Sequence, residues 1–304
     1  MASNRASFAD LLTPGFRKIF NDRYNEEPMV MDRVFNVNDS SKDTEKDSAV
    51  TGFGLAVQTA EGAPIDYEDP IQMYDTTYTH LKYTKGFKIT REMFEDDLYG
   101  IMNKRPAALG KAMRRTAEDQ ASLVFRRGFN SSYLGADSEE LFSTSHDRSD
   151  GGTAQSNASA TGITLTETNL ETGILAANGQ LDDKGQIIAI NPDTLLVPRA
   201  LRKTAHLIVD SPMRSGTADN DANVYKGQLD IIVWPYLTST TAWFLIDKSE
   251  HQLNWFWRER PLFKSDELFD TEYAVYKSTM RFSRGWSDWR GVWGSQGDGQ
   301  AYSG

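Results

Sequence analysis

The chain has 304 residues, of which 39% are hydrophobic and 25% are charged, with 23 glycines and 10 prolines. This balance is typical of a folded globular protein and excludes wholesale disorder. The lack of cysteine excludes disulfide scaffolds, thiolate zinc sites, iron–sulfur clusters and cysteine nucleophiles. A net charge of −10 argues against a protein that grips nucleic acid through many phosphate contacts.

The sequence offers no segment that would enter a membrane. Its longest apolar runs, such as Ile231–Trp234, fall far short of the roughly 20 residues that a membrane-spanning helix needs. The first residues, MASNRASFADLLTPGF, lack the basic and then apolar order of a signal peptide. We therefore expect no membrane partner and no export through such a signal.

Charge is unevenly distributed along the chain. Residues 104–130 hold seven basic and two acidic residues, a net charge of +5. Residues 131–185 hold nine acidic and two basic residues, a net charge of −7. Two interpretations stay open: the segments attract each other, within one chain or between copies, or they form two solvated surfaces.

The first 50 residues predict an arm. A short helix is expected over residues 8–20, and the polar run DSSKDTEKDS at 39–48 follows it. Such a run has too few apolar side chains to fold alone, so we expect it to be flexible or to be ordered by a partner.

Residues 51–90 predict two strands around a long polar tip. Phe53, Leu55 and Val57 alternate on the first strand, and the returning run Tyr74–Thr90 is rich in threonine, tyrosine and lysine. Both faces of this hairpin are polar, which favours a projecting element over a strand of the core.

The longest periodic segment predicts a helix of about 23 residues. Pro106 suits its first turn and Gly128 its end, and a shorter helical segment precedes it at 90–102. Apolar residues recur mostly three or four positions apart along it: Leu109, Met113, Ala117, Ala121, Val124 and Phe125.

A stretch rich in glycine, serine, threonine and asparagine at 131–165, which includes SDGGTAQSNASATG, predicts a loop or a domain boundary. Helices and strands are expected after this stretch. The helices are expected at 166–178 and 199–209, an apolar run stands at 195–198, and the strands are expected at 187–190, 229–234, 242–247, 253–257, 273–282 and 286–292.

No pattern of catalytic or ligand-binding residues stands out. The four histidines are scattered singly, and His146 beside Asp147 is interpreted as a turn residue rather than a catalytic one. Gly52-Phe53-Gly54 lacks the third glycine and the following helix of a dinucleotide-binding loop. We therefore expect no enzyme activity, no catalytic residue, no cofactor and no metal. Three carboxylate pairs have nothing in the sequence that unites them in one pocket: Glu26-Glu27, Asp96-Asp97 and Asp182-Asp183.

The order of arm, polar hairpin, long helix, α/β middle part and late strands resembles the major capsid protein of tailed bacteriophages. The resemblance covers most of residues 17–293, and its phrases are specific through their order and spacing. KGFKITREMFEDD at 85–97 and AEDQASLVF at 117–125 resemble the start and end of the family's helical part, LFSTSH at 141–146 and LLVPRAL at 195–201 resemble its Mu-like head-subunit branch, and GQLDIIVWP at 227–235 resembles its late strand.

The resemblance implies an α+β fold, the tailed-phage major capsid fold. This fold has an N-terminal arm, an extended β-hairpin loop, a peripheral domain with a long spine helix, and an axial α/β domain. The implied boundaries are 1–50 for the arm, 51–90 for the loop, 91–131 for the spine helix, 132–245 for the axial domain, 246–285 for the β return of the peripheral domain, and 286–304 for the last axial strand and C-terminal tail.

The same resemblance implies a structural protein that self-assembles into hexamers and pentamers, which form the icosahedral head around the phage genome. Its implied partners are further copies of the chain, a portal, a separate scaffold protein, a decoration protein, and packaged double-stranded DNA contacted non-specifically. The protein would be made in the host bacterial cytoplasm and reside in the virion. Some relatives join subunits by a lysine–asparagine bond, but nothing here marks the acceptor asparagine or the catalytic acid.

Contacts with neighbouring subunits are expected from the arm, the hairpin and the long helix. A polar hairpin buries too little surface to offset an ordering entropy of roughly 1–2 kcal/mol per residue unless neighbours cover it. The apolar side chains among these contacts should therefore be exposed in a single chain. The expected contact residues are Phe8, Phe16, Leu55, Tyr78, Lys82, Lys85, Arg114, Arg115, Arg126 and Arg127.

An extended subunit is the corresponding prediction for the whole chain. A compact chain of this size would have a radius of gyration of roughly 19 Å and an accessible surface of roughly 13,000 Å², and we expect both to be exceeded. The alternative function is a secreted, β-rich module that binds carbohydrate or a surface. It would use the late tryptophans Trp255, Trp257, Trp286, Trp289 and Trp293.

Overall fold

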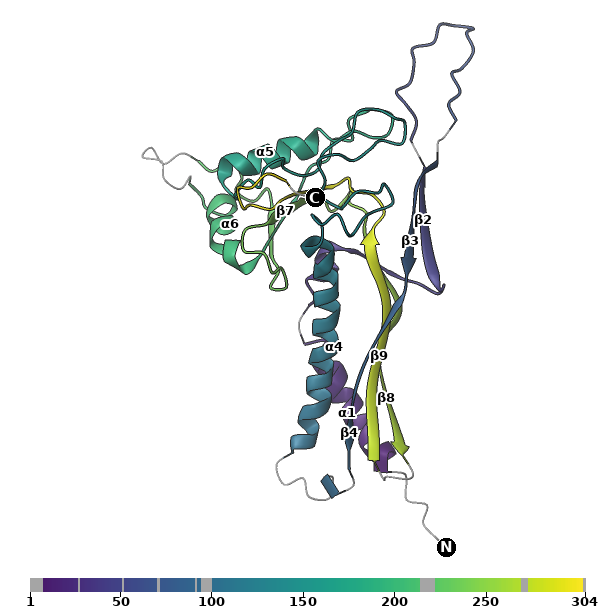
Figure 1. Ribbon diagram of the computed structural model, residues 1–304, viewed down its shortest axis with the longest axis vertical. Coiled ribbons are helices and arrows are strands. Elements are labelled where there is room, and N and C mark those ends of the chain that lie inside the picture. The colour runs from purple at the N-terminus through teal and green to yellow at the C-terminus, as the bar shows by residue number, and fades with distance from the viewer. Residues whose placement is uncertain are drawn as a thin grey trace.

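A long helix and a long four-stranded sheet form the stem of the molecule, and a second sheet with its own helices lies at one end of that stem (Figure 1). This computed structural model describes residues 8–26, 28–50, 52–69, 72–90, 92–93, 100–213, 222–268 and 273–302. The helices are α1 (Phe8–Tyr24), α2 (Met31–Val34), α4 (Ile101–Arg126), α5 (Glu167–Asn178), the 3₁₀ turn η1 (Arg199–Leu201) and α6 (Arg202–Val209). The strands are β1 (Asn36–Asp39), β2 (Thr44–Val50), β3 (Gln72–Thr79), β4 (Leu81–Ile89), β5 (Thr194–Val197), β6 (Asp230–Val233), β7 (Trp243–Ile246), β8 (Leu253–Leu268), β9 (Tyr273–Trp286) and β10 (Val292–Ser295).

The large sheet has the strand order β1-β8-β9-β4. β8 and β9 form a long antiparallel hairpin, β4 pairs antiparallel with β9, and β1 adds in parallel to β8. Helices α1 and α4 pack on one face of this sheet. The ring of Phe16 on α1 lies 6.4 Å from that of Phe87 and 5.2 Å from that of Tyr276, measured between centroids. This face of the sheet is therefore the core side.

α4 has 26 residues and one apolar face. Leu109, Met113 and Ala117 are buried along that face. Close approach of α1 depends on Gly110, because an added Cβ there would lie 2.6 Å from the carbonyl oxygen of Phe20. The two helices and the sheet thus form one continuous core along the stem.

The second sheet has the order β10-β7-β5-β6, in which β5 and β6 are parallel and the other pairs are antiparallel. Trp243 on β7 and Trp293 on β10 are buried, with their ring centroids 5.0 Å apart. Gly173 of α5 lies against Trp293, where an added Cβ would be 2.9 Å from the indole. α5 packs over β10, and α6 packs beside β5 and β6.

β2 and β3 form a separate two-stranded antiparallel ribbon. The ribbon continues past the end of β9, and residues 52–69 extend beyond it as an irregular loop (Figure 1). The predicted hairpin is therefore present, but its first strand was misplaced. That strand is the polar run Thr44–Val50, whereas Phe53, Leu55 and Val57 lie outside the strands. Backbone pairing with β3, rather than apolar burial, stabilises it.

Other predicted elements agree with the structure to different degrees. The helices expected at 166–178 and 199–209 are confirmed, and the long helix begins at Ile101 rather than near Pro106. The strand expected at 187–190 is wrong, because Ala189 has a φ of 58°, in the left-handed region, and Ile187 forms only an isolated bridge with Leu181. The strand expected at 286–292 is also wrong, since Trp286 ends β9 and β10 begins at Val292. Much of the shorter helical segment expected at 90–102 lies outside the described residues, which omit 91 and 94–99.

The single chain exposes 17,085 Å², which exceeds the roughly 13,000 Å² of a compact chain of this mass, as predicted. The predicted sources of this excess are correct only in part. Leu55 is 76% exposed, but Phe16 and Tyr78 are only 2% and 3% exposed. The prediction of exposure was wrong for these two because α1 folds back onto the sheet and β3 packs against β8; the side chain of Phe8 lies outside the described residues.

Candidate functional site

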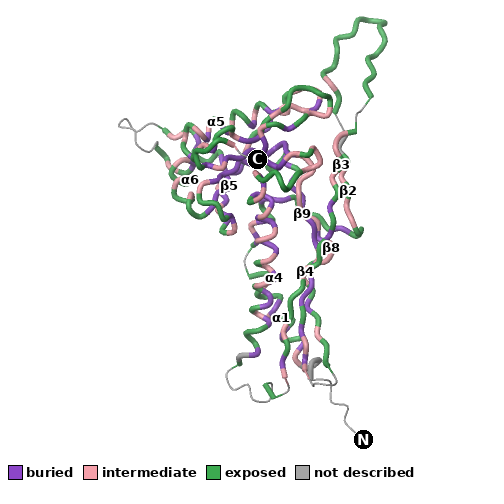
Figure 2. Tube along the Cα trace, viewed as in Figure 1, coloured by how far each residue is buried: buried purple, intermediate pink, exposed green. Residues whose placement is uncertain are grey.

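Large apolar side chains gather in solvent on residues 52–69, which we term the acidic loop. Figure 2 shows this loop as an exposed excursion beyond β2 and β3. It holds four acidic residues and no basic one: Glu61, Asp66, Glu68 and Asp69. Its exposed apolar side chains are Phe53 (76%), Leu55 (76%), Val57 (65%), Ile65 (69%) and Tyr67 (87%). A single chain leaves this apolar surface uncovered.

Glu68 closes the base of the acidic loop. One carboxylate oxygen accepts a hydrogen bond of 2.7 Å from the backbone N–H of Gly54, across the two sides of the loop. The other oxygen pairs with the ammonium group of Lys184, which lies beyond α5. The hydrogen bond from Lys184, followed by that from Gly54, holds the pKa of Glu68 below its usual range. The contacts of Glu68 thus fix the base of the loop, while the apolar side chains beyond it stay exposed to solvent.

A network of side chains fixes the ribbon to the large sheet. The Ser287 hydroxyl donates to Asp47 of β2, so Tyr78 of β3 donates its own proton to the Ser287 oxygen, 2.7 Å away. The amide of Asn254 on β8 donates to both oxygens, at 3.3 and 3.0 Å. Burial raises the pKa of Tyr78, which therefore keeps this proton at neutral pH. Tyr78 anchors the ribbon rather than extending toward solvent.

The face of the large sheet opposite the helices is basic. Tyr83 and Phe87 of β4 contact rings of the core, so the alternate residues of β4 point to the other face. Lys82 pairs with Arg281 across β4 and β9, and residues directly opposite in an antiparallel pair share a face. The same reasoning gives the members of this basic sheet face: Lys82, Lys88, Lys264, Lys277 and Arg281.

The charges of the basic sheet face are mostly uncompensated. Its four lysines are exposed, and none forms an ion pair with a carboxylate within the part of the chain that the structure describes. Arg281 lies 3.6 Å from a carboxylate oxygen of Asp43. Asp266 and Glu259 of β8 stand opposite β9 residues of this face and reduce its charge without removing it. The face can therefore attract an acidic surface.

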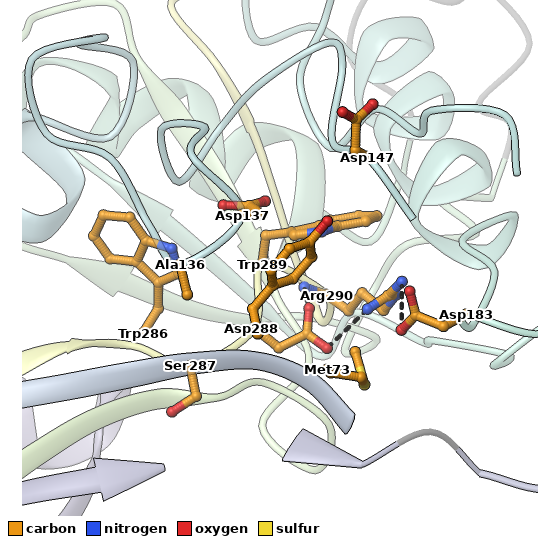
Figure 3. Close-up of a pocket in the computed structure, with 11 residues that line it drawn as sticks. Met73, Ala136, Asp137, Asp147, Asp183, Trp286, Ser287, Asp288, Trp289 and Arg290 are labelled. Carbon is orange, nitrogen blue, oxygen red and sulfur yellow. Dashed lines mark hydrogen bonds and ion pairs between the residues drawn. The ribbon is translucent and has the colours of Figure 1, made fainter. Parts of the chain in front are cut away.

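A small cavity lies between β3 and the segments 136–147 and 286–290, and four acids and Arg290 are among its lining residues (Figure 3). Arg290 lies between the carboxylates of Asp183 and Asp288, at 3.2 and 3.0 Å. The described residues contain no group of three histidines or acids that could hold a metal ion. Arg290 holds two of the four acids and the ring of His146 contacts a third, Asp137, so these contacts join parts of the fold.

His146 belongs to this joint. It is fully buried, with its ring stacked on Trp289 at 4.4 Å between centroids. Its Nδ1 lies 2.7 Å from a carboxylate oxygen of Asp137, and its Nε2 lies 3.1 Å from the side-chain oxygen of Asn157. The interpretation of His146 as a turn residue was wrong, because His146 is buried and forms an antiparallel β-bridge with Gln155.

The late tryptophans do not form a platform for sugar stacking. Trp255, Trp257, Trp289 and Trp293 are between 0% and 4% exposed, and Trp286 is half-buried. The carbohydrate-binding alternative depended on exposed indole rings, so this alternative is wrong. Trp289 stacks on His146, and the other four rings pack in or against the two cores.

The structure separates the other predicted contact residues into two groups. Lys82 and Lys85 are exposed on β4. The four arginines lie on α4 or at its end, each in a different setting. Arg114 donates to the carbonyl of Pro28, Arg115 is exposed, Arg126 pairs with Asp119 at 3.0 Å, and Arg127 lies over the ring of Tyr133. Their contacts with other copies stay a prediction.

Sequence reasoning missed two features of these surfaces. Lys264 and Lys277 join Lys82 only through strand register, whereas the alternation of β4 alone places Lys82 and Lys88 on one face. Arg284 meets Arg127 only because β9 runs beside α4.

Among the described residues, no helix combines the length and apolar character needed to cross a bilayer.

Comparison with known proteins identifies the fold. A family described as phage capsid protein matches residues 74–295. The fold is similar to that of the bacteriophage JBD30 procapsid, with a TM-score of 0.52 and 16% identity over 94% of this chain and 74% of the other. It is also similar to the capsid of the cyanophage P-SCSP1u, with a TM-score of 0.58 and 10% identity over 88% of both chains.

A virus-like particle from Pyrococcus furiosus has a similar fold, with a TM-score of 0.55 and 9% identity over 93% of this chain and 98% of that one. No curated protein matches the chain. The predicted α+β fold of tailed-phage capsids is confirmed by these similarities.

Proposed function

Because this chain belongs to the phage capsid protein family, we propose that its structural role in the virion is carried out by hexamers and pentamers of the chain, which close an icosahedral head. The family confirms the predicted structural, non-enzymatic role and location in the virion. The Mu-like branch, the domain boundaries, synthesis in the host cytoplasm and the partnership with portal, scaffold, decoration protein and packaged DNA are further parts of the proposal.

The acidic loop is the observation that supports assembly most directly. It presents five exposed apolar side chains, which a subunit in isolation would leave in water. The hydrogen bonds of Tyr78 fix the ribbon of β2 and β3 to the stem, and this ribbon holds the loop and its apolar side chains away from the core. A second copy that covers the loop removes this apolar area from water, and symmetry repeats the contact around the particle.

We propose that the acidic loop of one copy lies against the basic sheet face of another. Besides Glu68, which pairs with Lys184, the loop contains three carboxylates and no basic group, and the sheet face contains four exposed lysines. Opposite charge favours this pairing over contact between two loops or two sheet faces. Leu262, which is 43% exposed on β8, also gives the sheet face apolar area for the loop's side chains.

Deletion of residues 55–66, with two glycines in their place, tests this function. Gly54, Glu68 and the whole of β2 and β3 remain, so the subunit should stay folded, as circular dichroism would show. Electron microscopy should then show capsomers or particles for the unaltered chain and none for the deletion. Normal particles from the deleted chain would contradict the proposal.

A charge exchange tests the chosen surfaces. Lys82→Glu with Lys277→Glu should prevent assembly, as should Glu61→Lys with Asp66→Lys, because each places like charges in contact. Combining all four changes should restore particles. Lys203→Glu, on the exposed side of α6, is a control that should assemble normally. Failure of the combined variant to recover would count against this pair of surfaces.

A further inference from the structure

Two arginines share one cavity at the junction of the stem and the second sheet. Arg127 caps the end of α4, and Arg284 lies near the end of β9. The cavity has a volume of about 260 Å³. We term it the arginine pocket, and its lining residues are Leu123, Val124, Arg127, Tyr133, Leu134, Arg284, Gly285 and Trp286.

The arginine pocket lacks a counter-charge. Neither Arg127 nor Arg284 forms an ion pair with a carboxylate among the residues described by the structure. Asp119 lies close enough to influence Arg284, but its carboxylate is engaged by Arg126 at 3.0 Å. Burial lowers the pKa of Arg284, the hydroxyl of Tyr83 opposes this effect, and the positive charge of Arg127 adds to it. The single chain therefore holds two like charges together at a cost.

This arrangement differs from that of Arg290, which is buried. Arg290 is 7% exposed, and the fold supplies it with two carboxylates, those of Asp183 and Asp288. The chain has 43 acidic and 33 basic residues, so acids are not scarce. The missing partner of Arg127 and Arg284 is therefore expected from outside the chain.

We propose that the arginine pocket receives an aspartate or glutamate side chain from a second copy of this chain. Guanidinium groups present planar sets of donors that fit the two oxygens of a carboxylate. The remaining wall is largely apolar and aromatic, which suits the side chains next to that acid in a peptide better than a hydrated nucleic-acid backbone. Tyr133 and Leu134 are 42% and 51% exposed at the pocket, and a docked segment would cover them.

The proposal rests on the assembly function, since only assembly brings a second copy to the pocket. A paired substitution, Arg127→Gln with Arg284→Gln, should raise the protein concentration needed for half-assembly at least tenfold. The thermal midpoint of the isolated subunit should not fall, because the change removes a repulsion. Lys203→Gln combined with Lys226→Gln removes the same charge from exposed positions and should leave assembly unchanged. Equal assembly of the paired variant and wild type would overturn the proposal.

Cross-linking identifies the occupant. A photoreactive benzoylphenylalanine at Tyr133 is placed in particles assembled from equal amounts of ¹⁴N- and ¹⁵N-labelled chains. Mass spectrometry should find mixed-isotope cross-links to a peptide containing aspartate or glutamate. Cross-links confined to one chain, or to DNA, would overturn the proposal. If wild-type chains form no particles, the assembly function itself fails; if particles form without these cross-links, only the pocket assignment fails.

Discussion

At the residue scale, the buried acid Glu118 of α4 holds three parts of the molecule together. One carboxylate oxygen accepts from the backbone N–H of Val30 at 2.6 Å, and the other accepts from the indole N–H of Trp234 at 2.7 Å. Its side chain is only 4% exposed, and burial raises its pKa although these hydrogen bonds oppose the effect. Glu118 thereby links the stem helix to the segment before α2 and to the turn after β6.

Replacing this carboxylate should leave two buried donors without an acceptor. We expect Glu118→Ala to lower the free energy of unfolding by about 1–3 kcal/mol, measured by urea denaturation of the isolated subunit. The adjacent Asp119 is half-exposed and pairs with Arg126, so Asp119→Ala should cost only about 0–1 kcal/mol. Equal losses for the two variants would contradict the role of Glu118.

His251 gives the subunit a pH dependence of known sign. Burial, the largest cause, lowers the pKa of His251, while Asp247 and Asp193 oppose that effect. Its Nδ1 accepts a hydrogen bond of 3.2 Å from the backbone N–H of Leu253, which protonation at Nδ1 would remove. Since the folded pKa lies below the unfolded value of about 6.5, the stabilisation is present above that value and is lost as pH falls through the folded pKa.

The free energy of unfolding should therefore decrease as the pH is lowered below about 6.5. His251→Asn keeps an acceptor near Leu253 without a titrating ring, so part of this decrease should disappear. His206→Gln removes an exposed histidine and should retain the wild-type decrease. A His251→Asn profile parallel to that of wild type, measured by urea denaturation from pH 7.5 to 5, would refute the assignment.

At the element scale, the crossing of α1 and α4 depends on a single missing side chain. Gly110→Ala would improve helix propensity, but its Cβ would meet the Phe20 carbonyl oxygen at 2.6 Å and the Tyr24 nitrogen at 3.3 Å. We expect the clash to prevail and destabilise the subunit by about 1–3 kcal/mol. Gly15→Ala on α1 meets nothing within 4 Å, so it should stabilise by about 0.5–1 kcal/mol. Thermal unfolding should show a lower midpoint for Gly110→Ala and a higher midpoint for Gly15→Ala. A shift of both midpoints in the same direction would refute the explanation.

The elements that the sequence predicted correctly are those whose own pattern carries the signal. α4 repeats its apolar residues at helical spacing, and α5 has Thr166 as an N-cap that accepts from Asn169. β2 was missed because DSSKDTEKDS has no apolar alternation and becomes a strand only by pairing with β3. The burial of Phe16 likewise depends on a sheet whose strands β4, β8 and β9 come much later in the chain.

The candidate surfaces were predictable to a smaller extent. Exposure of the acidic loop followed from its polar composition, and Leu55 was correctly placed in solvent. The basic sheet face requires the register of β4 with β9 and of β9 with β8, which composition does not determine. The arginine pocket requires the approach of α4 to β9, so Arg284 carried no local signal at all.

At the scale of the whole molecule, the distribution of apolar surface sets the shape. The stem and the second sheet each have an aromatic core, whereas the acidic loop has none and is held away from both by the ribbon. The loop's acids and the lysines of the sheet face cannot neutralise each other within one chain if the loop stays extended. The acidic loop and the basic sheet face of one chain therefore each need a second copy as partner. This favours association between copies over folding of the loop onto its own chain.

The shape of the isolated subunit gives the last prediction. Under dissociating conditions that retain the fold, small-angle X-ray scattering should give a radius of gyration clearly above the roughly 19 Å of a compact chain of this length. Replacing residues 55–66 by two glycines shortens each side of the loop by about five residues, so the maximum dimension should decrease by roughly 15 Å at 3.3 Å per residue. If the loop instead folds against the stem, the same deletion should leave the maximum dimension unchanged. An unchanged maximum dimension would thus show that the loop is covered by its own chain, and the reason for a second copy to bind it would be lost.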